Sequence, residues 1–260
     1  MTALKDIRCF LLDMDGTFYL GNRIIEGSLD FIAKLRSTAR DFLFLTNNSS
    51  HNAPFYVERL KRMGLCVGRE KILTSGEATA RILLKNYAGK RVYVLGNEFL
   101  KNELLEAGVL LDEENPEMVV IGYDTTLDYK KMTRVCDLVR DGLPYVATHP
   151  DFNCPTETGF APDIGAIMAF IEASAFRRPE LIVGKPYPGI VEAALERTGL
   201  AIHEMAMVGD RLYTDIETGR RSGMTSILVM SGETTPEMLA KSEIRPDYVF
   251  GRLAEIIDYL

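Results

Sequence analysis

Short apolar runs alternate along the chain with longer amphipathic stretches. The short runs are nearly all apolar, which favours strands buried on both faces, while the longer stretches carry apolar residues at helical spacing. The expected strands are Ile7–Leu12, Phe42–Leu45, Val92–Leu95, Met118–Ile121, Tyr145–Thr148, Leu181–Val183, Met205–Val208, Ser226–Val229 and Tyr248–Phe250. The expected helices are Leu29–Ala39, Phe55–Met63, Glu98–Ala107, Tyr129–Arg140, Ile164–Ala175, Gly189–Thr198 and Asp215–Ser222. This alternation predicts an α/β protein with parallel sheets that helices cover on both faces.

Two further features refine this organisation. Gly21 and Asn22 stand between two β-prone triplets, Phe18–Leu20 and Arg23–Ile25, and predict a small hairpin. The middle of the chain has strands and helices of its own and can form a second α/β unit inserted into the first, with Phe176–Pro179 as the returning linker. We expect a doubly wound core from 1–79 plus 180–260 and an inserted unit from 80–179.

Composition excludes several classes of protein. The 260 residues carry a net charge of -7, which argues against broad binding to nucleic acids or anionic membranes. No apolar stretch approaches the roughly 20 residues of a membrane helix, and the start of the chain lacks a secretory signal. Four scattered cysteines predict reduced thiols in a cytoplasmic protein. Three distant histidines disfavour a zinc site, so a metal is expected to have oxygen ligands.

Polar side chains follow four of the expected strands at the point where each ends. In open parallel sheets the functional site lies beyond the carboxyl ends of the strands, so these side chains are expected to converge. The four groups are Asp13, Asp15, Gly16 and Thr17; Thr46, Asn47 and Asn48; Gly184 and Lys185; and Gly209, Asp210 and Asp215.

Each group also has a purely structural interpretation. Asp13–Gly16 could be a solvated turn. A calcium-binding EF-hand is excluded by spacing: counted from Asp13, Gly16 is fourth where that loop needs glycine at position six, and Ile24 is twelfth where it needs glutamate. Thr46 and its neighbours could cap a helix, Lys185 could be a surface lysine, and Asp210 could cap the next helix. Four such coincidences at four strand ends are less economical than one site.

The residue types suit phosphoryl transfer. Carboxylates held close together need a divalent cation, and a few carboxylates with water and substrate phosphate are the ligands of Mg²⁺. An ionised aspartate can attack phosphorus without a base to activate it, and a lysine and a hydroxyl can stabilise the phosphoryl charge. A second carboxyl two residues later can transfer the proton, because Met14 between the two aspartates points to the opposite side.

In order, these elements resemble the haloacid dehalogenase-like (HAD) phosphatase superfamily. Its motifs are D-x-D-G-T, a Thr or Ser after a strand, a Lys, and G-D-x-x-x-x-D, matched here by 13–17, Thr46, Lys185 and 209–215. The stretches "LTNNSS" and "GKP", with the long interval between Thr46 and Lys185, resemble the NagD-like subfamily. The resemblance implies a Rossmann-like core with an inserted α/β cap of the C2 type.

The resemblance also implies roles for the core residues. Asp13 would be the nucleophile and Asp15 the general acid and base, while Thr46, Asn47 and Lys185 would bind the phosphoryl group. The hairpin at Gly21–Asn22 resembles the flap of the family.

Magnesium would be held by Asp13, the main-chain carbonyl of Asp15, and Asp210, with Asp215 in support.

Two positions depart from the subfamily pattern and concern the substrate. A basic residue often follows "TNNSS" where this chain has His51, and "TNPD" is common where it has "THPD" at 148–151. The cap of such enzymes selects the substrate, so His149, Asp151 and Asn153, in the segment Thr148–Ala166, are candidate substrate contacts, against the alternative of a structural loop.

The sequence therefore predicts a cytoplasmic, Mg²⁺-dependent phosphatase. It would hydrolyse small phosphate monoesters, such as sugar phosphates, nucleotides or p-nitrophenyl phosphate, through an aspartyl-phosphate. The alternatives are a phosphoryl-accepting signalling protein without turnover, a dehalogenase, for which Asp15 and Asp210 would be superfluous, and a binding protein without activity. No nucleic-acid or membrane partner is expected, and the oligomeric state is left open, a homodimer included.

Overall fold

The chain forms two compact units in the computed structural model, which describes residues 3–156 and 159–260. The core unit comprises Met1–Thr46, Ala53–Leu73 and Lys185–Leu260, and the second unit comprises Asn47–Asn52 and Thr74–Gly184. The expected boundaries, 79/80 and 179/180, thus differ from the observed ones, and the loop 47–52 belongs by its contacts to the second unit. That the second unit acts as a cap stays a prediction.

A six-stranded sheet in the order β15-β14-β13-β1-β4-β5 forms the centre of the core unit. Its strands are β1 (Cys9–Leu12), β4 (Asp41–Thr46), β5 (Ile72–Thr74), β13 (Met205–Gly209), β14 (Thr225–Val229) and β15 (Tyr248–Phe250). β1 pairs in parallel with β13 on one side and with β4 on the other, in a register that sets Leu12 beside Val208 and Phe44. The chain order therefore reverses at β1, and such a switch point is where ligands bind in doubly wound folds.

Helices cover this sheet because alternate residues of each strand face opposite sides. Phe10 and Leu12 of β1 belong to one apolar cluster with Phe31 of α1 and Leu60 of α2. The core-unit helices are α1 (Ser28–Ser37), α2 (Ala53–Arg62), α7 (Pro188–Thr198), α8 (Glu217–Ser222) and α9 (Pro236–Lys241), and α7 contacts α8. A short hairpin of β2 (Tyr19–Leu20) and β3 (Arg23–Ile24) follows β1, where the Gly21–Asn22 turn predicts it.

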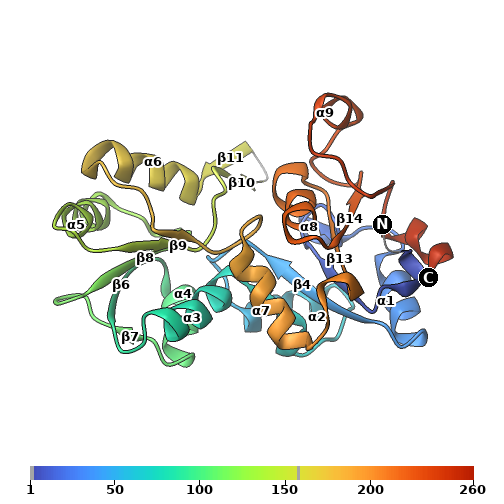
Figure 1. Cartoon of the computed structure of the whole chain (residues 1–260), viewed down its shortest axis with the longest axis horizontal. Helices are drawn as coiled ribbons and strands as arrows, with labels where there is room; N and C mark the ends of the chain where they lie inside the picture. Colours follow the sequence, from blue (N-terminus) through green and yellow to red (C-terminus); the bar gives the residue numbers. More distant parts are fainter. Residues whose placement is uncertain (1–2, 157–158) are drawn as a thin grey trace. The chain divides into compact units, whose positions relative to one another are not determined.

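The second unit contains a five-stranded parallel sheet in the order β12-β9-β8-β6-β7. Figure 1 shows α5 and α6 on one face of this sheet and α3 and α4 on the other. The strands are β6 (Arg91–Leu95), β7 (Leu110–Leu111), β8 (Met118–Ile121), β9 (Tyr145–Ala147) and β12 (Leu181–Ile182), with a separate hairpin of β10 (Asn153–Thr156) and β11 (Gly159–Pro162). The helices are α3 (Ser75–Asn86), α4 (Glu98–Glu106), α5 (Tyr129–Arg140) and α6 (Ile164–Ala175).

The two-unit parallel-sheet α/β architecture is confirmed, but one strand was expected in the wrong sheet. Leu181–Val183 was expected in the core, whereas Leu181 and Ile182 pair in parallel with Val146 and Ala147 of β9 in the second unit. A three-residue apolar run fits the edge of either sheet equally well, so its sequence pattern cannot choose between them.

One charge cluster in the core unit makes a testable contribution to stability. The Glu217 carboxylate, at the start of α8 and only 6% exposed, accepts hydrogen bonds from Arg220 Nε at 2.6 Å and from Arg221 Nε at 2.6 Å. These hydrogen bonds, that of Arg220 foremost, lower the pKa of Glu217 to about 2.

Replacing Glu217 with Gln is expected to lower the free energy of unfolding by about 1–2 kcal/mol at pH 7, because both arginines are half-exposed and screened by solvent. Since the folded pKa lies below the unfolded value, this stabilisation is present above roughly pH 4.5 and disappears as the pH falls towards 2. Urea unfolding of both proteins at pH 7 and at about pH 2.5 measures the difference. Glu58→Gln, at an exposed ion pair, is the control and should change stability by less than about 0.5 kcal/mol. An equal loss at both pH values would contradict the assignment.

Candidate active site

Asp13 is the first residue after β1 and lies at the switch point of the core sheet. Its backbone N–H donates to the carbonyl of Val208 at 2.9 Å, which continues the pairing of β1 with β13 by one residue. Because Leu12 also stands beside Phe44, Thr46 at the end of β4 lies at the same edge of the sheet. The convergence that the sequence predicts for these strand ends is therefore present for Asp13, Thr46 and Asp210.

Three carboxylates meet at this edge. Oxygen atoms of Asp13, Asp210 and Asp215 all lie within 4.8 Å of one another. Asp215 is fully buried in a turn of π-helix, Leu212–Ile216, that leads into α8, and such turns are frequent at functional sites. Lys185, 2% exposed, forms salt bridges with Asp13 and with Asp215, the latter at 2.7 Å.

The charges of this cluster do not balance. Burial and the charges of Asp13 and Asp215 raise the pKa of Asp210 well above its usual range, and burial raises that of Asp215 in spite of the nearby lysine. Burial opposes the charge of Lys185, but Asp13 and Asp215 outweigh it and raise the pKa of its ammonium. Three carboxylates facing one ammonium leave a deficit of positive charge, which a divalent cation would supply.

Neighbouring glycines and backbone donors fix the orientation of Asp210. A Cβ atom on Gly232 would lie 2.0 Å from Asp210 Oδ2, and one on Gly16, where φ is +85°, would lie 2.4 Å from it. The backbone N–H of Glu233 donates to Asp210 Oδ2 at 2.6 Å, and Thr17 Oγ1 donates to Oδ1 at 3.5 Å. The close approach of backbone to carboxylate thus requires glycine at both positions.

Asp15 lies at the start of the β2–β3 hairpin, with its side chain open to solvent on one side. The surrounding protein still restricts its hydration, and this and the charge of Asp13 raise its pKa. The positive charge of Arg59, and to a smaller extent the backbone of Gly21, partly offset this rise in the pKa of Asp15. Asp13 and Asp15 therefore differ in environment, as a nucleophile and a proton-transfer group require.

Comparison with known proteins agrees with this arrangement. Residues 10–110 match the haloacid dehalogenase-like hydrolase family, and residues 182–256 match a HAD-hydrolase-like family. An acid sugar phosphatase of Staphylococcus saprophyticus is 36% identical over 258 residues, which cover 99% of each chain. The crystal structure of a 4-nitrophenylphosphatase from Thermotoga maritima is 48% identical, covers 98% of each chain and superimposes with a TM-score of 0.96. The chain is a NagD-like phosphatase of the haloacid dehalogenase-like hydrolase family.

The carboxylate cluster of the phosphatase suits a divalent metal. Oxygen ligands, a charge deficit and a partly open neighbouring aspartate are what Mg²⁺ or Ca²⁺ needs, and neither prefers nitrogen or sulfur. A glycerol phosphate phosphatase from Mycobacterium tuberculosis, 30% identical over 97% of this chain and 77% of its own, was solved in complex with magnesium, with a TM-score of 0.89. The same protein was also solved with calcium. Asp13, Asp210 and Asp215 are the protein ligands that this geometry offers.

Arg211 is a residue of the phosphatase site that sequence reasoning missed. It directly follows Asp210, its side chain is 18% exposed, and its Nε lies 2.9 Å from Glu233 Oε2. The charges of Asp13, Glu233 and Asp210 help to raise the pKa of the guanidinium, against the effect of burial. In the sequence "GDRLYTD", an arginine that follows an aspartate is typical of an ordinary surface pair. The contact of Arg211 with Glu233 arises only because the segment 230–234 folds around Asp210.

Asn47, expected to bind phosphate, is engaged within the second unit of the phosphatase. Its Nδ2 donates to both carboxylate oxygens of Asp151 at 3.2 Å, and Ser75 Oγ donates to its backbone carbonyl at 2.5 Å. Gly184 approaches the same side chain so closely that a Cβ there would lie 2.6 Å from Asn47 Oδ1. Asp151, 9% exposed, thus holds Asn47, and a direct contact of either with substrate stays a prediction.

The other two expected substrate contacts of the second unit, His149 and Asn153, differ in how far they are buried. His149 is completely buried, with Nε2 at 3.1 Å from Asp163 Oδ1 and Nδ1 at 3.0 Å from Thr148 Oγ1. Asp163 also caps the first turn of α6. This network favours a structural role for His149, whereas Asn153, at the start of β10, is exposed. Residues 157 and 158 of the segment Thr148–Ala166 lie outside the described residues.

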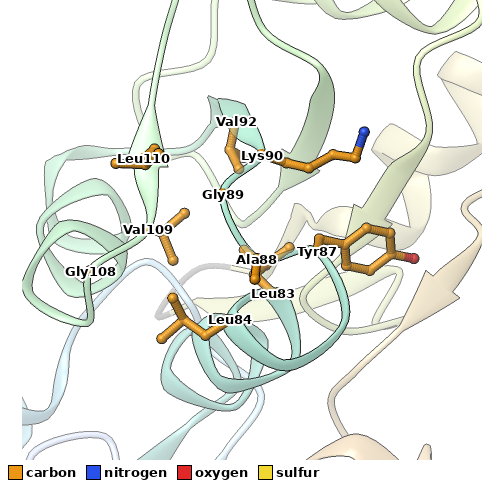
Figure 2. A pocket seen from close by; sticks show the side chains of 10 residues that line it. All are labelled: Leu83, Leu84, Tyr87, Ala88, Gly89, Lys90, Val92, Gly108, Val109 and Leu110. Carbon is orange, nitrogen blue, oxygen red and sulfur yellow. The ribbon is translucent and has the colours of Figure 1, made fainter.

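The second unit of the phosphatase also contains a hollow of about 200 Å³ (Figure 2). Its lining is mostly apolar, unlike the polar groups described above. It lies between the end of α3 and the edge strand β7 and is lined largely by aliphatic side chains, including Leu83, Leu84, Val109 and Leu110. Lys90 is the one charged residue of this lining, whereas a phosphate needs several cations or N–H donors, so the hollow does not suit the head group of a phosphate ester. In the described ranges, 3–156 and 159–260, no helix is long and apolar enough to cross a membrane.

Proposed function

We propose that the protein hydrolyses small phosphate monoesters with Mg²⁺ and through a phosphoryl-aspartate at Asp13. The observation that carries this proposal is the meeting of Asp13, Asp210 and Asp215 with Lys185 at the switch point of the core sheet. Of the three carboxylates, that of Asp13 is the most accessible to solvent, since its side chain is 16% exposed whereas Asp210 is 2% exposed and Asp215 is fully buried. The attacking oxygen therefore comes from Asp13.

In the first step an oxygen of Asp13 bonds to phosphorus while the bond from phosphorus to the ester oxygen breaks. The departing oxygen takes the proton of Asp15, whose raised pKa favours the protonated form that can donate it. In the second step Asp15, now ionised, accepts a proton from water as that water attacks phosphorus. The acyl-phosphate bond breaks, inorganic phosphate leaves, and both aspartates regain their initial state.

Thr46 and Lys185 bind the phosphoryl oxygens in this scheme. The Lys185 ammonium donates to Asp13 and to Asp215, which holds its positive charge beside the attacking carboxylate. Thr46 presents a hydroxyl at the end of β4, 7% exposed and beside the end of β1. Asn47 contributes by holding the loop that follows Thr46, through its bonds to Asp151 and Ser75.

Asp13, Asp210 and the main-chain carbonyl of Asp15 would hold Mg²⁺, and Asp215 would support them. The bound ion would neutralise charge on the phosphoryl group and on the clustered carboxylates. Magnesium is favoured over calcium because few carboxylates, with water and phosphate completing the shell, match its small octahedral coordination.

The names of the relatives support a proposal for the substrate class. Relatives are named for sugar phosphates and for 4-nitrophenyl phosphate, and we propose the same class of small phosphate esters, sugar phosphates first, for this chain. Nucleoside monophosphates are further candidate substrates of this class.

A turnover assay with and without metal tests the proposal. Protein dialysed against a chelator is expected to lose activity on 4-nitrophenyl phosphate and on a panel of sugar phosphates and nucleoside monophosphates, and to regain it with Mg²⁺. Phosphate released should exceed the enzyme many times over, and rapid acid quenching should trap phosphate on a peptide containing Asp13. Release of no more than one equivalent would support the signalling alternative, and full activity in the chelated protein would overturn the metal assignment.

A further inference from the structure

The hairpin that follows Asp15 cannot hold its shape by its own strands. β2 and β3 have two residues each, and isolated hairpins even of ordinary length are marginal in water. Leu20, Gly21, Asn22 and Arg23 at its tip are all exposed. Its position must therefore be fixed by contacts with the rest of the core unit.

Arg59 of α2 supplies two of these contacts. Its Nη2 donates to the carbonyl of Gly21 at 2.7 Å, at the turn of the hairpin. Its guanidinium also lies over the ring of Tyr19, with Cζ 4.6 Å from the ring centroid, within the range of a cation–π interaction. Tyr19 is itself 2% exposed, and its hydroxyl contacts Met14 Sδ at 3.8 Å, next to both aspartates in sequence.

The β2–β3 hairpin connects Arg59 to Asp15. Asp15 forms an isolated β-bridge with Tyr19, and the backbone N–H of Gly16 donates to the carbonyl of Tyr19 at 2.7 Å. Arg59 holds the other side of the same hairpin, through the ring of Tyr19 and the carbonyl of Gly21. Arg59 thus fixes the hairpin against which the backbone of Asp15 is held.

We propose that Arg59 is a positioning residue for proton transfer, acting on Asp15 through the β2–β3 hairpin. The inference rests on the role of Asp15 in the proposed function. Arg59 belongs to a helix packed in the core, since its neighbours Tyr56 and Leu60 are buried, so it offers the hairpin a rigid support. Without it, Asp15 would keep its charge and its place in the chain but lose the geometry for delivering a proton to the leaving oxygen.

The dependence of the rate on the leaving group separates this role from a merely structural one. Phenyl phosphate and 4-nitrophenyl phosphate have nearly the same shape, but phenolate is the poorer leaving group and needs the proton more. In Arg59→Met, kcat/KM for phenyl phosphate is expected to fall about tenfold and that for 4-nitrophenyl phosphate about twofold or less. Arg59→Lys, which keeps a donor and a cation, should recover most of the loss. Equal losses for both esters would overturn the inference.

A double-mutant cycle with Asp15 completes the test. In an Asp15→Asn background, Arg59→Met is expected to lower kcat/KM for phenyl phosphate by no more than about twofold, because the residue it acts through is gone. A further full tenfold loss there would also overturn the inference. If Asp15→Asn itself shows no preference between the two esters, the proposed role of Asp15 fails, which is a separate result. Arg62→Met, three residues further on and exposed, is the matched control, and thermal unfolding of each variant measures any change in stability.

Discussion

Replacing Asp13 with Asn is expected to lower kcat by at least about 10⁴-fold while the protein stays folded. The amide is nearly the same size but is a poor nucleophile, so the proposed covalent step could not begin. The change also removes one of three clustered carboxylates, which lessens their mutual repulsion, although the salt bridge to Lys185 is lost with it. These two effects oppose each other, and the free energy of unfolding is expected to change by less than about 1 kcal/mol.

Steady-state kinetics on 4-nitrophenyl phosphate and urea unfolding, both in Mg²⁺, measure the two parts of this expectation. Asp258→Asn, at an exposed position of the same unit, is the matched control and should leave both unchanged. Near-normal turnover by Asp13→Asn would show that another group attacks phosphorus. If Asp13→Asn loses activity because it unfolds, acid quenching of the wild-type protein decides the assignment. In that experiment the trapped phosphate must be found on Asp13.

Replacing Lys185 with Met is the substitution with the second largest expected effect. The ammonium is fully enclosed and neutralises Asp13 and Asp215 together, so its loss leaves buried negative charge without a partner. Breaking such an arrangement typically costs about 3–5 kcal/mol of stability, and the loss of a cation at the phosphoryl group should lower kcat by about 10²–10³-fold.

Metal binding gives this second prediction a distinctive signature. In the proposed site Lys185 and the divalent cation would neutralise the same carboxylates, so Mg²⁺ should restore part of the stability that Lys185→Met loses. The difference in melting temperature between variant and wild type is expected to be larger in chelator than in Mg²⁺. Lys61→Met removes a surface lysine, 62% exposed, and should show neither effect. An identical difference in both conditions would argue that the lysine and the metal act on separate groups.

The sequence predicts most of the regular structure because buried parallel strands carry an unmistakable pattern. β8 and α5 have the bounds expected from their apolar spacing, Met118–Ile121 and Tyr129–Arg140. The helix α3 was missed, although Thr74 caps it by accepting from the backbone N–H of Glu77, because Ala and Gly weaken its apolar stripe. The hairpin of β10 and β11 was missed for a different reason, since Pro and Gly in the segment read as a loop.

The candidate site shows the same division between local and long-range information. Asp13 and Asp210 are predicted because each follows a strand of the core sheet, and the topology of parallel sheets brings such residues together. Lys185 also reaches Asp13, although the strand before it belongs to the sheet of the second unit. Arg59 carries no local signal, since it contacts a turn 38 residues earlier in the chain. His149 illustrates the converse, because a histidine in a polar loop reads as exposed, while its bonds to Thr148 and Asp163 bury it completely.

The division of the chain into its two units has a consequence for how such proteins can be recombined. The second unit is made of two separate pieces, and the shorter, Asn47–Asn52, begins directly after Thr46. Its residues are held by the longer piece, for example through Asn97 Nδ2 to the carbonyl of Ser50 at 2.9 Å and Thr148 Oγ1 to Ser49 Oγ at 3.0 Å. The longer piece ends at Gly184, one residue before Lys185. A chimaera that exchanges only the long segment would therefore mismatch six residues adjoining Thr46. An exchange of the whole second unit has to transplant both pieces together, with seams at 46/47, 52/53, 73/74 and 184/185.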